Sequence, residues 1–94
     1  DEIAKALGDK KVAILQNHGI LTTGPSVDIA LWFYMSMERC CQAQLMAEAA
    51  GKPISISHDT AVKTREFIAN DIAAWASYQP AFDKIVKMQP DLLD

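Results

Sequence analysis

The chain has 94 residues, of which half are hydrophobic and 22% are charged, and its formal net charge is −3. These values are ordinary for a globular chain and leave room for one domain at most. The lysines and arginines are scattered and form no basic stripe, so neither a nucleic acid nor an anionic membrane surface is expected as a partner. The longest apolar run, residues 29–35, is far shorter than the ~20 residues that a membrane-spanning helix needs.

Cys40 and Cys41 are adjacent, and neighbouring side chains of a helix point about 100° apart. The two thiols therefore do not readily form a disulfide with each other or bind one metal ion together. We interpret them as reduced, buried thiols of a cytoplasmic protein. The chain opens at Asp1 without a secretory signal pattern, which is compatible with an internal piece of a longer protein.

Residues 1–7 predict a short helix that is closed by Gly8, or the tail of a longer helix. The aliphatic segments 11–16 and 20–23 predict two strands, or one strand bent by a bulge at His18 and Gly19. The first segment is apolar at consecutive positions, so we expect it to be buried on both faces of a sheet.

A long helix is predicted over residues 27–50, between a capping Ser26 and a terminating Gly51. Its first half, residues 29–37, is apolar almost all round and has no clean solvent face, which is typical of an enclosed helix. A chain of this size can hardly cover a helix about 36 Å long on all sides. We therefore expect this helix to be buried against further sequence or another subunit, and the isolated chain to associate.

The remaining chain is expected to be helical. The alternating segment 54–57 predicts a short edge strand or an extended connection, and Ser57 or Asp59 can cap an amphipathic helix after it. Pro80 is predicted to interrupt this helix, and a last helical segment then runs until Pro90.

His18 is the main candidate for chemistry. A neutral imidazole at a strand end, followed by a glycine that permits close approach, is suited to a divalent metal. A single histidine in a strand–turn–strand unit is, however, more often a hydrogen-bonded structural residue, and zinc takes three or four protein ligands. His58 starts a polar helix and is expected to be solvated. No glycine-rich phosphate loop or nucleophile elbow is present, so we assign no catalytic and no cofactor-binding residue.

Two further groups are interpreted as structural. Glu38 and Arg39 lie in an apolar part of the long helix, and we expect Glu38 to bond Gln42 one turn on while Arg39 reaches an external acid. The two tryptophans and Tyr78 occur at helical spacing among aliphatic residues, which favours packing over a binding cage.

Residues 12–51 closely resemble the later half of the class II aldolase/adducin family. The matching positions are Asn17, His18, Gly19, Gly24, Val27, Asp28, Ala30, Glu38, Cys40, Gln42 and Leu45. The resemblance implies a three-layer α/β/α fold with a central, largely antiparallel sheet, assembled as a homotetramer. Residues 1–94 are then the C-terminal portion of a single domain of this kind.

The resemblance also implies a metal. Catalytic members hold zinc or another divalent ion with three histidines, two from a His-x-His element early in the domain and one from the Asn-His-Gly element that His18 matches. The ion would polarise a carbonyl or stabilise an enediolate while an upstream acid moves the proton. The His-x-His pair, the acid and the phosphate-binding loops are not among these residues, so we expect this chain alone to be inactive.

Two functions follow from the resemblance. The first is that of a metal-dependent carbon–carbon lyase or epimerase whose substrate is a small hydroxy-carbonyl compound, such as a sugar phosphate. The alternative is a non-catalytic adducin-like interaction or oligomerisation module, because adducin head domains are similar over the same stretch and also carry the Asn-His-Gly triplet.

Overall fold

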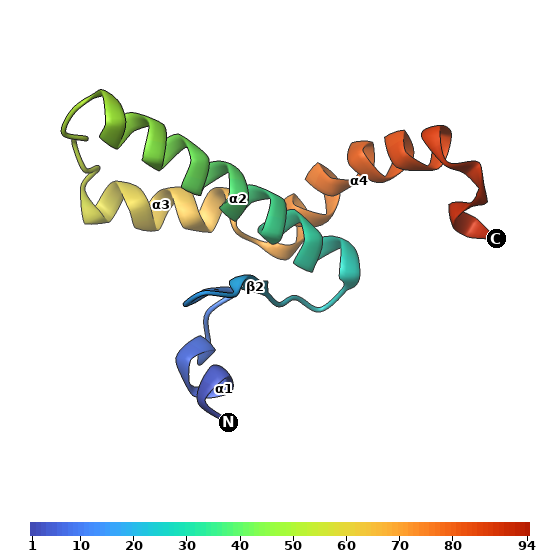
Figure 1. Cartoon of the computed structure of the whole chain (residues 1–94), viewed down its shortest axis with the longest axis horizontal. Helices are drawn as coiled ribbons and strands as arrows, with labels where there is room; N and C mark the ends of the chain where they lie inside the picture. The colour runs from blue at the N-terminus through green and yellow to red at the C-terminus, as the bar shows by residue number, and fades with distance from the viewer.

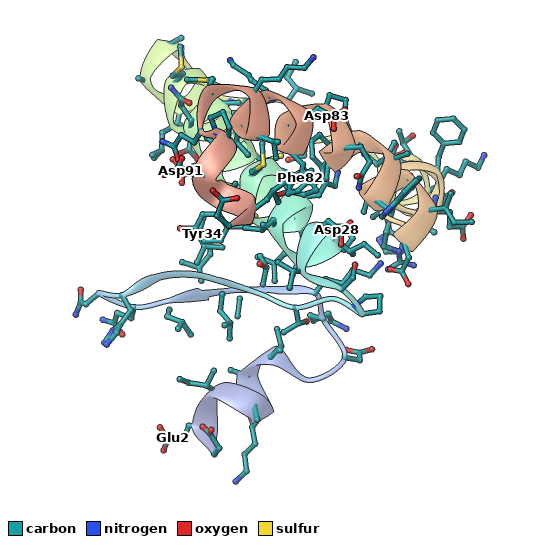
Figure 2. All side chains as sticks on the ribbon, turned by 90° about the vertical axis from the view of Figure 1, so that its right-hand side faces the viewer. Glu2, Asp28, Tyr34, Phe82, Asp83 and Asp91 are labelled. Carbon is teal, nitrogen blue, oxygen red and sulfur yellow. The ribbon has the colours of Figure 1, made fainter.

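The computed structural model describes all 94 residues. Its elements are α1 (Glu2–Leu7), β1 (Val12–Leu15), β2 (Gly19–Thr22), α2 (Val27–Ala50), α3 (His58–Ile68), α4 (Asp71–Met88) and a short 3₁₀ helix η1 (Pro90–Leu93). The two strands form a hairpin, with α1 on one face and the long helix α2 on the other (Figure 2). Helix α4 packs on α2 and then runs out toward the C-terminus (Figure 1). The layering is helix, sheet, helix, which confirms the predicted α/β/α fold class.

The hairpin is a two-stranded antiparallel sheet. Val12 pairs with Thr22 at its base, and Leu15 pairs with Gly19 next to the turn. Three residues, 16–18, connect the strands, and the His18 N–H donates to the Leu15 carbonyl at 3.1 Å. The structure thus contains two strands and a tight turn rather than one bent strand.

Helix α2 begins and ends where the capping residues predict. The Ser26 hydroxyl accepts a hydrogen bond from the Ile29 N–H at 3.4 Å, and Gly51 follows the last helical residue. The Thr22 hydroxyl donates to the Ala30 carbonyl at 2.8 Å, which ties β2 to the first turn of the helix. No helix of the chain combines the length and the hydropathy that crossing a membrane requires.

The core is very small. Three of the 94 residues are buried, namely Ile29, Phe33 and Ala74, where α4 crosses the first half of α2. The radius of gyration is 15.7 Å, whereas a compact domain of about 100 residues has about 13 Å. The enclosure expected of α2 is therefore not provided by these 94 residues, and Leu31 in its first half is 40% exposed. The same holds for β1, in which Ile14 is 63% exposed.

The C-terminal helices divide at a different place from the one predicted. Residues 54–57 form an extended connection rather than a strand, and Ser57 caps α3 by accepting the Thr60 N–H at 3.2 Å. The helical segment is interrupted at Ala69 and Asn70, and α4 then runs from Asp71 through Pro80 to Met88. The predicted interruption at Pro80 is wrong.

The capping at Asn70 explains the observed break. Its side-chain oxygen accepts the Ala73 N–H at 2.9 Å, and its side-chain nitrogen donates to the Phe67 carbonyl at 3.0 Å. One residue thus satisfies the end of α3 and the start of α4. Pro80 removes a single backbone donor from α4, and the neighbouring Gln79 side chain adds a hydrogen bond to the Trp75 carbonyl at 3.0 Å.

Candidate functional site

His18 lies in the turn of the hairpin. The turn is at the end of the hairpin opposite to Asp28, which marks the start of α2 (Figure 2). The backbone of Asn17 is left-handed, with φ of 60°, a conformation that asparagine tolerates better than most residues. Gly19 has φ of 137°, which requires glycine. These two residues give the turn its shape and leave His18 exposed at its corner.

The His18 ring is held by the turn itself. Its Nδ1 atom lies 3.0 Å from the Gln16 carbonyl oxygen. A carbonyl oxygen can only accept, so the hydrogen of the neutral ring is on Nδ1 in this contact, and Nε2 keeps its lone pair. Histidines that bind metals through Nε2 are commonly oriented in this way, by a carbonyl that accepts from the other ring nitrogen. The Gln16 carbonyl is a backbone group, so its contact with His18 does not depend on the residue type and could not be predicted from the sequence.

The surroundings of His18 are mostly apolar. The ring borders a shallow depression of about 290 Å³ that is also lined by Ile3, Ile14, Leu15 and Gln16. Nowhere in the chain do three or more histidine, cysteine, aspartate or glutamate side chains gather as a metal-binding group. The donor set of these residues therefore fits one ligand position of a metal site and not a complete coordination shell.

The other candidates lie apart from His18. His58 is exposed at the start of α3, as predicted, and lines a separate depression with Asp59, Lys63 and Glu66. Cys40 is exposed and Cys41 is partly exposed on α2, and both thiols are free. They lie beside Ile14 in an apolar groove of about 450 Å³ between β1 and α2. The expected burial of the two thiols is not provided by this chain.

The charged pair of α2 makes no hydrogen bond or ion pair. Glu38 and Arg39 are both exposed, and the side-chain bond along this helix joins Gln44 to Glu48 at 3.2 Å. The predicted bond from Glu38 to Gln42 is wrong, because an exposed carboxylate is solvated by water and gains little from a neutral neighbour.

The aromatic residues mainly pack. Trp32 lies against the small core, and the rings of Tyr78 and Phe82 form a tilted pair with centroids 6.4 Å apart. Trp75 is half exposed, so the packing expected of this residue is not provided by these 94 residues. The aromatic side chains therefore form no cage around a ligand.

The Asp28 carboxylate accepts hydrogen bonds from two other side chains. Its pKa is held below the ordinary value by hydrogen bonds from the Ser26 hydroxyl and the Gln79 amide, the latter at 3.1 Å. The Gln79 contact joins α4 to the start of α2, at the far end of the hairpin from His18. Asp28 therefore stabilises the fold and takes no part in the candidate site.

Comparisons with known proteins agree with this architecture. Residues 1–45 match the sequence pattern of the family described as Class II Aldolase and Adducin N-terminal domain. The chain is 39% identical over 90 residues to the decarboxylase NovR of Streptomyces niveus, covering 96% of this chain and 33% of that protein. It is 37% identical over 90 residues to the 4-hydroxy-3-prenylphenylpyruvate oxygenase/4-hydroxy-3-prenylbenzoate synthase of Streptomyces roseochromogenus subsp. oscitans, covering 96% of this chain and 32% of that protein. The chain thus spans about a third of the length of these curated relatives.

A solved structure is similar over nearly the whole chain. The L-fuculose 1-phosphate aldolase from Glaciozyma antarctica PI12 superimposes with a TM-score of 0.90 and 39% sequence identity, covering 95% of this chain and 36% of that protein. The family match includes the hairpin, the Asn17-His18-Gly19 turn and most of α2. On the agreement of sequence, turn and fold, the chain belongs to the class II aldolase/adducin family.

Proposed function

We propose that residues 1–94 are the C-terminal portion of a single class II aldolase/adducin-type domain. The whole protein is then a cytoplasmic, divalent-metal-dependent enzyme, a carbon–carbon lyase or epimerase, that acts on a small hydroxy-carbonyl compound. The observation that carries this proposal is the His18 ring, which is exposed, fixed through Nδ1 by the Gln16 carbonyl at 3.0 Å, and open at Nε2. The similarity to an L-fuculose 1-phosphate aldolase supports the reaction class.

In this proposal His18 is one ligand of zinc or another divalent ion. The ion supplies Lewis-acid chemistry, which polarises a substrate carbonyl. The Gln16 carbonyl keeps the hydrogen on Nδ1 and so presents the lone pair of Nε2 outward. The other ligands and the proton-transferring acid come from outside these residues. The 94-residue chain by itself is inactive, since one imidazole does not retain a catalytic ion.

We further propose that the protein is a homo-oligomer, with a tetramer as in the family. The support is the apolar surface that this chain leaves uncovered on α2 and β1, including Leu31, Tyr34 and Ile14, which are 40%, 42% and 63% exposed. A chain with three buried residues needs further apolar contacts to reach the stability of an ordinary domain.

The metal content of purified protein tests the role of His18. The longest expressible chain that contains these residues is purified as wild type, His18→Ala and His58→Ala, and its metals are quantified by plasma mass spectrometry. We expect about one divalent ion per chain in the wild type and in His58→Ala, and a drop of about tenfold or more in His18→Ala. His58 is the matched control because it is the other histidine and is also exposed. Equal metal content in all three proteins refutes the proposed ligand.

A second candidate reaction is the oxidative breakdown of an aromatic 2-oxo acid. It is favoured by two relatives that match 96% of this chain, one named a decarboxylase and the other a 4-hydroxy-3-prenylphenylpyruvate oxygenase. The two reactions are distinguished by parallel assays on the metal-loaded protein, with retro-aldol cleavage of sugar phosphates in one and oxygen uptake with arylpyruvates in the other. A wild-type protein that holds no metal and passes neither assay supports the non-catalytic adducin-like module instead.

A further inference from the structure

Lys11, the residue before β1, reaches across to the junction between α3 and α4. Its Nζ atom donates a hydrogen bond to the carbonyl of Ala69, the residue that ends α3. The same atom is 4.0 Å from a carboxylate oxygen of Asp71, in the first turn of α4. It also lies 4.8 Å from the centroid of the Phe33 ring. Three partners from three helical segments therefore meet at one ammonium group.

Each partner suits a positive charge. The Ala69 carbonyl is at the C-terminal end of a helix, where carbonyl groups lack intrahelical partners and the helix dipole is negative. The Phe33 ring presents the negative face of an aromatic side chain, and Phe33 is 8% exposed, so the ammonium group has one apolar neighbour. The Lys11 side chain itself is 45% exposed, so solvent weakens the pairing with Asp71, and the three contacts act together rather than singly.

No other hydrogen bond or ion pair joins residues 1–23 to residues 51–94. The remaining long-range side-chain bond, from Gln79 to Asp28, joins α4 to α2. Helix α3 contains no buried residue, and its backbone lies close to α4 alone among the elements, while Phe67 and Ile68 at its end border a depression that α2 also lines. Apart from the packing of Ala69 and Ala74 at the core, the location of the α3–α4 junction relative to the hairpin therefore depends on Lys11.

We propose that Lys11 is a latch that fixes the α3–α4 junction against the base of the hairpin. With the latch closed, Ala69 stays over the small core and α3 is held at one end. With the latch open, α3 and the residues that join it to α4 are freer to move relative to the hairpin, since the packing of Ala69 and Ala74 at the core, the extended residues 51–57 and the contact between α3 and α4 are what remain. The latch is a conformational device at the end of the hairpin opposite to the His18 turn, and it is independent of any metal at His18.

Hydrogen exchange measured by mass spectrometry tests the latch. The longest expressible chain that contains these residues is compared as wild type, Lys11→Met and Lys10→Met. Lys10 is the matched control, because it pairs only with the adjacent Asp9. We expect amides of residues 66–74 to exchange about fivefold faster or more in Lys11→Met, and at the wild-type rate in Lys10→Met. Equal exchange of this segment in the two variants overturns the proposal.

A second comparison covers the case in which Lys11→Met does not fold. Asp71→Asn removes one partner of the latch, and Asp9→Asn removes the partner of Lys10. Faster exchange of residues 66–74 in Asp71→Asn alone supports the latch, and equal rates in both variants contradict it. Asp71 is also an acidic residue in the first turn of α4, where its charge favours the helix itself. The salt dependence of exchange on the α3 side distinguishes this role from its role as the partner of Lys11. High salt screens the charges of Lys11 and Asp71 and should therefore open the latch in the wild type. The amides of residues 66–69, on the α3 side, should then exchange faster at high salt in the wild type but not in Asp71→Asn.

Discussion

Replacing Gly24 by alanine should destabilise the fold through one added carbon atom. Gly24 follows β2 and lies against the first turn of α2. A Cβ atom at this position would be 3.0 Å from the Ala30 backbone nitrogen, 3.0 Å from the Ile29 Cγ2 atom and 3.4 Å from the Ile29 carbonyl carbon. The Ala30 N–H donates to the Ser26 carbonyl at 3.1 Å, so this nitrogen cannot retreat without loosening the first turn of the helix.

The size of the effect follows from two opposing contributions. Crowding by an extra carbon atom in a packed contact costs about 1–3 kcal/mol. Alanine also lowers the entropy of the unfolded chain, which returns about 0.4–1 kcal/mol where the backbone can accept it. The backbone of Gly24 does not have the positive φ that favours glycine. Because the backbone contact leaves the crowding unrelieved, we expect a net loss of about 1–2 kcal/mol in the free energy of unfolding.

Gly51→Ala is the matched control for this prediction. An added Cβ at Gly51 meets no atom within 4 Å, and its φ of 163° is extended backbone that any residue can adopt. Urea unfolding of the longest expressible chain, followed by circular dichroism, should place the midpoint of Gly24→Ala below that of the wild type and that of Gly51→Ala at or above it. If Gly24→Ala is as stable as Gly51→Ala, the close contact between Gly24 and α2 does not exist in solution.

Substitutions at two further residues, Asn70 and Gln79, address the C-terminal helices. Asn70→Ala removes the cap shared by α3 and α4 and should lower the free energy of unfolding by about 1–2 kcal/mol, while Asn70→Asp keeps the cap of α4 and recovers part of it, as urea unfolding would show. The Ser26 hydroxyl and the Gln79 amide lower the pKa of Asp28 in the folded protein. The hydrogen bonds to the Asp28 carboxylate therefore stabilise the folded protein above the unfolded-state pKa of about 3.9, and this stabilisation is lost as the pH falls through the lower pKa of the folded state. Gln79→Leu should therefore have a lower free energy of unfolding than the wild type near neutral pH, and urea unfolding in acid should show a smaller difference between the two proteins. A difference that stays constant with pH would exclude Asp28 as its source.

The elements that the sequence predicted well are those decided within a few residues. The two strands follow from aliphatic runs on either side of a short polar turn, and α2 begins at Ser26 and ends at Gly51 because a cap and a glycine act on their own segment. The division between α3 and α4 was missed because the prediction relied on Pro80 and did not consider Asn70 as a cap. In the structure Asn70 makes two side-chain bonds that end one helix and start the next.

Burial could not be predicted from the local pattern. The apolar first half of α2 does indicate a helix that needs covering, yet within this half only Ile29 and Phe33 are buried in the structure. A hydrophobic pattern records that a surface is to be buried and does not say which polypeptide buries it. The latch residue Lys11 was missed for a similar reason, since its three partners lie 22 to 60 residues away in the sequence.

The Asn-His-Gly triplet can now be divided into a structural part and a chemical part. The turn needs left-handed or otherwise positive φ at Asn17 and Gly19, and these are the two residues of the hairpin with such angles. His18 has no positive φ, is exposed, and makes its one side-chain hydrogen bond inside the turn, so the backbone does not require an imidazole there. We therefore expect His18→Ala to change the free energy of unfolding of the metal-free protein by no more than about 0.5 kcal/mol. Measured by urea unfolding in a chelator, a loss as large as that of Gly24→Ala would show that the ring belongs to the fold, and a metal loss in the same variant would then be indirect.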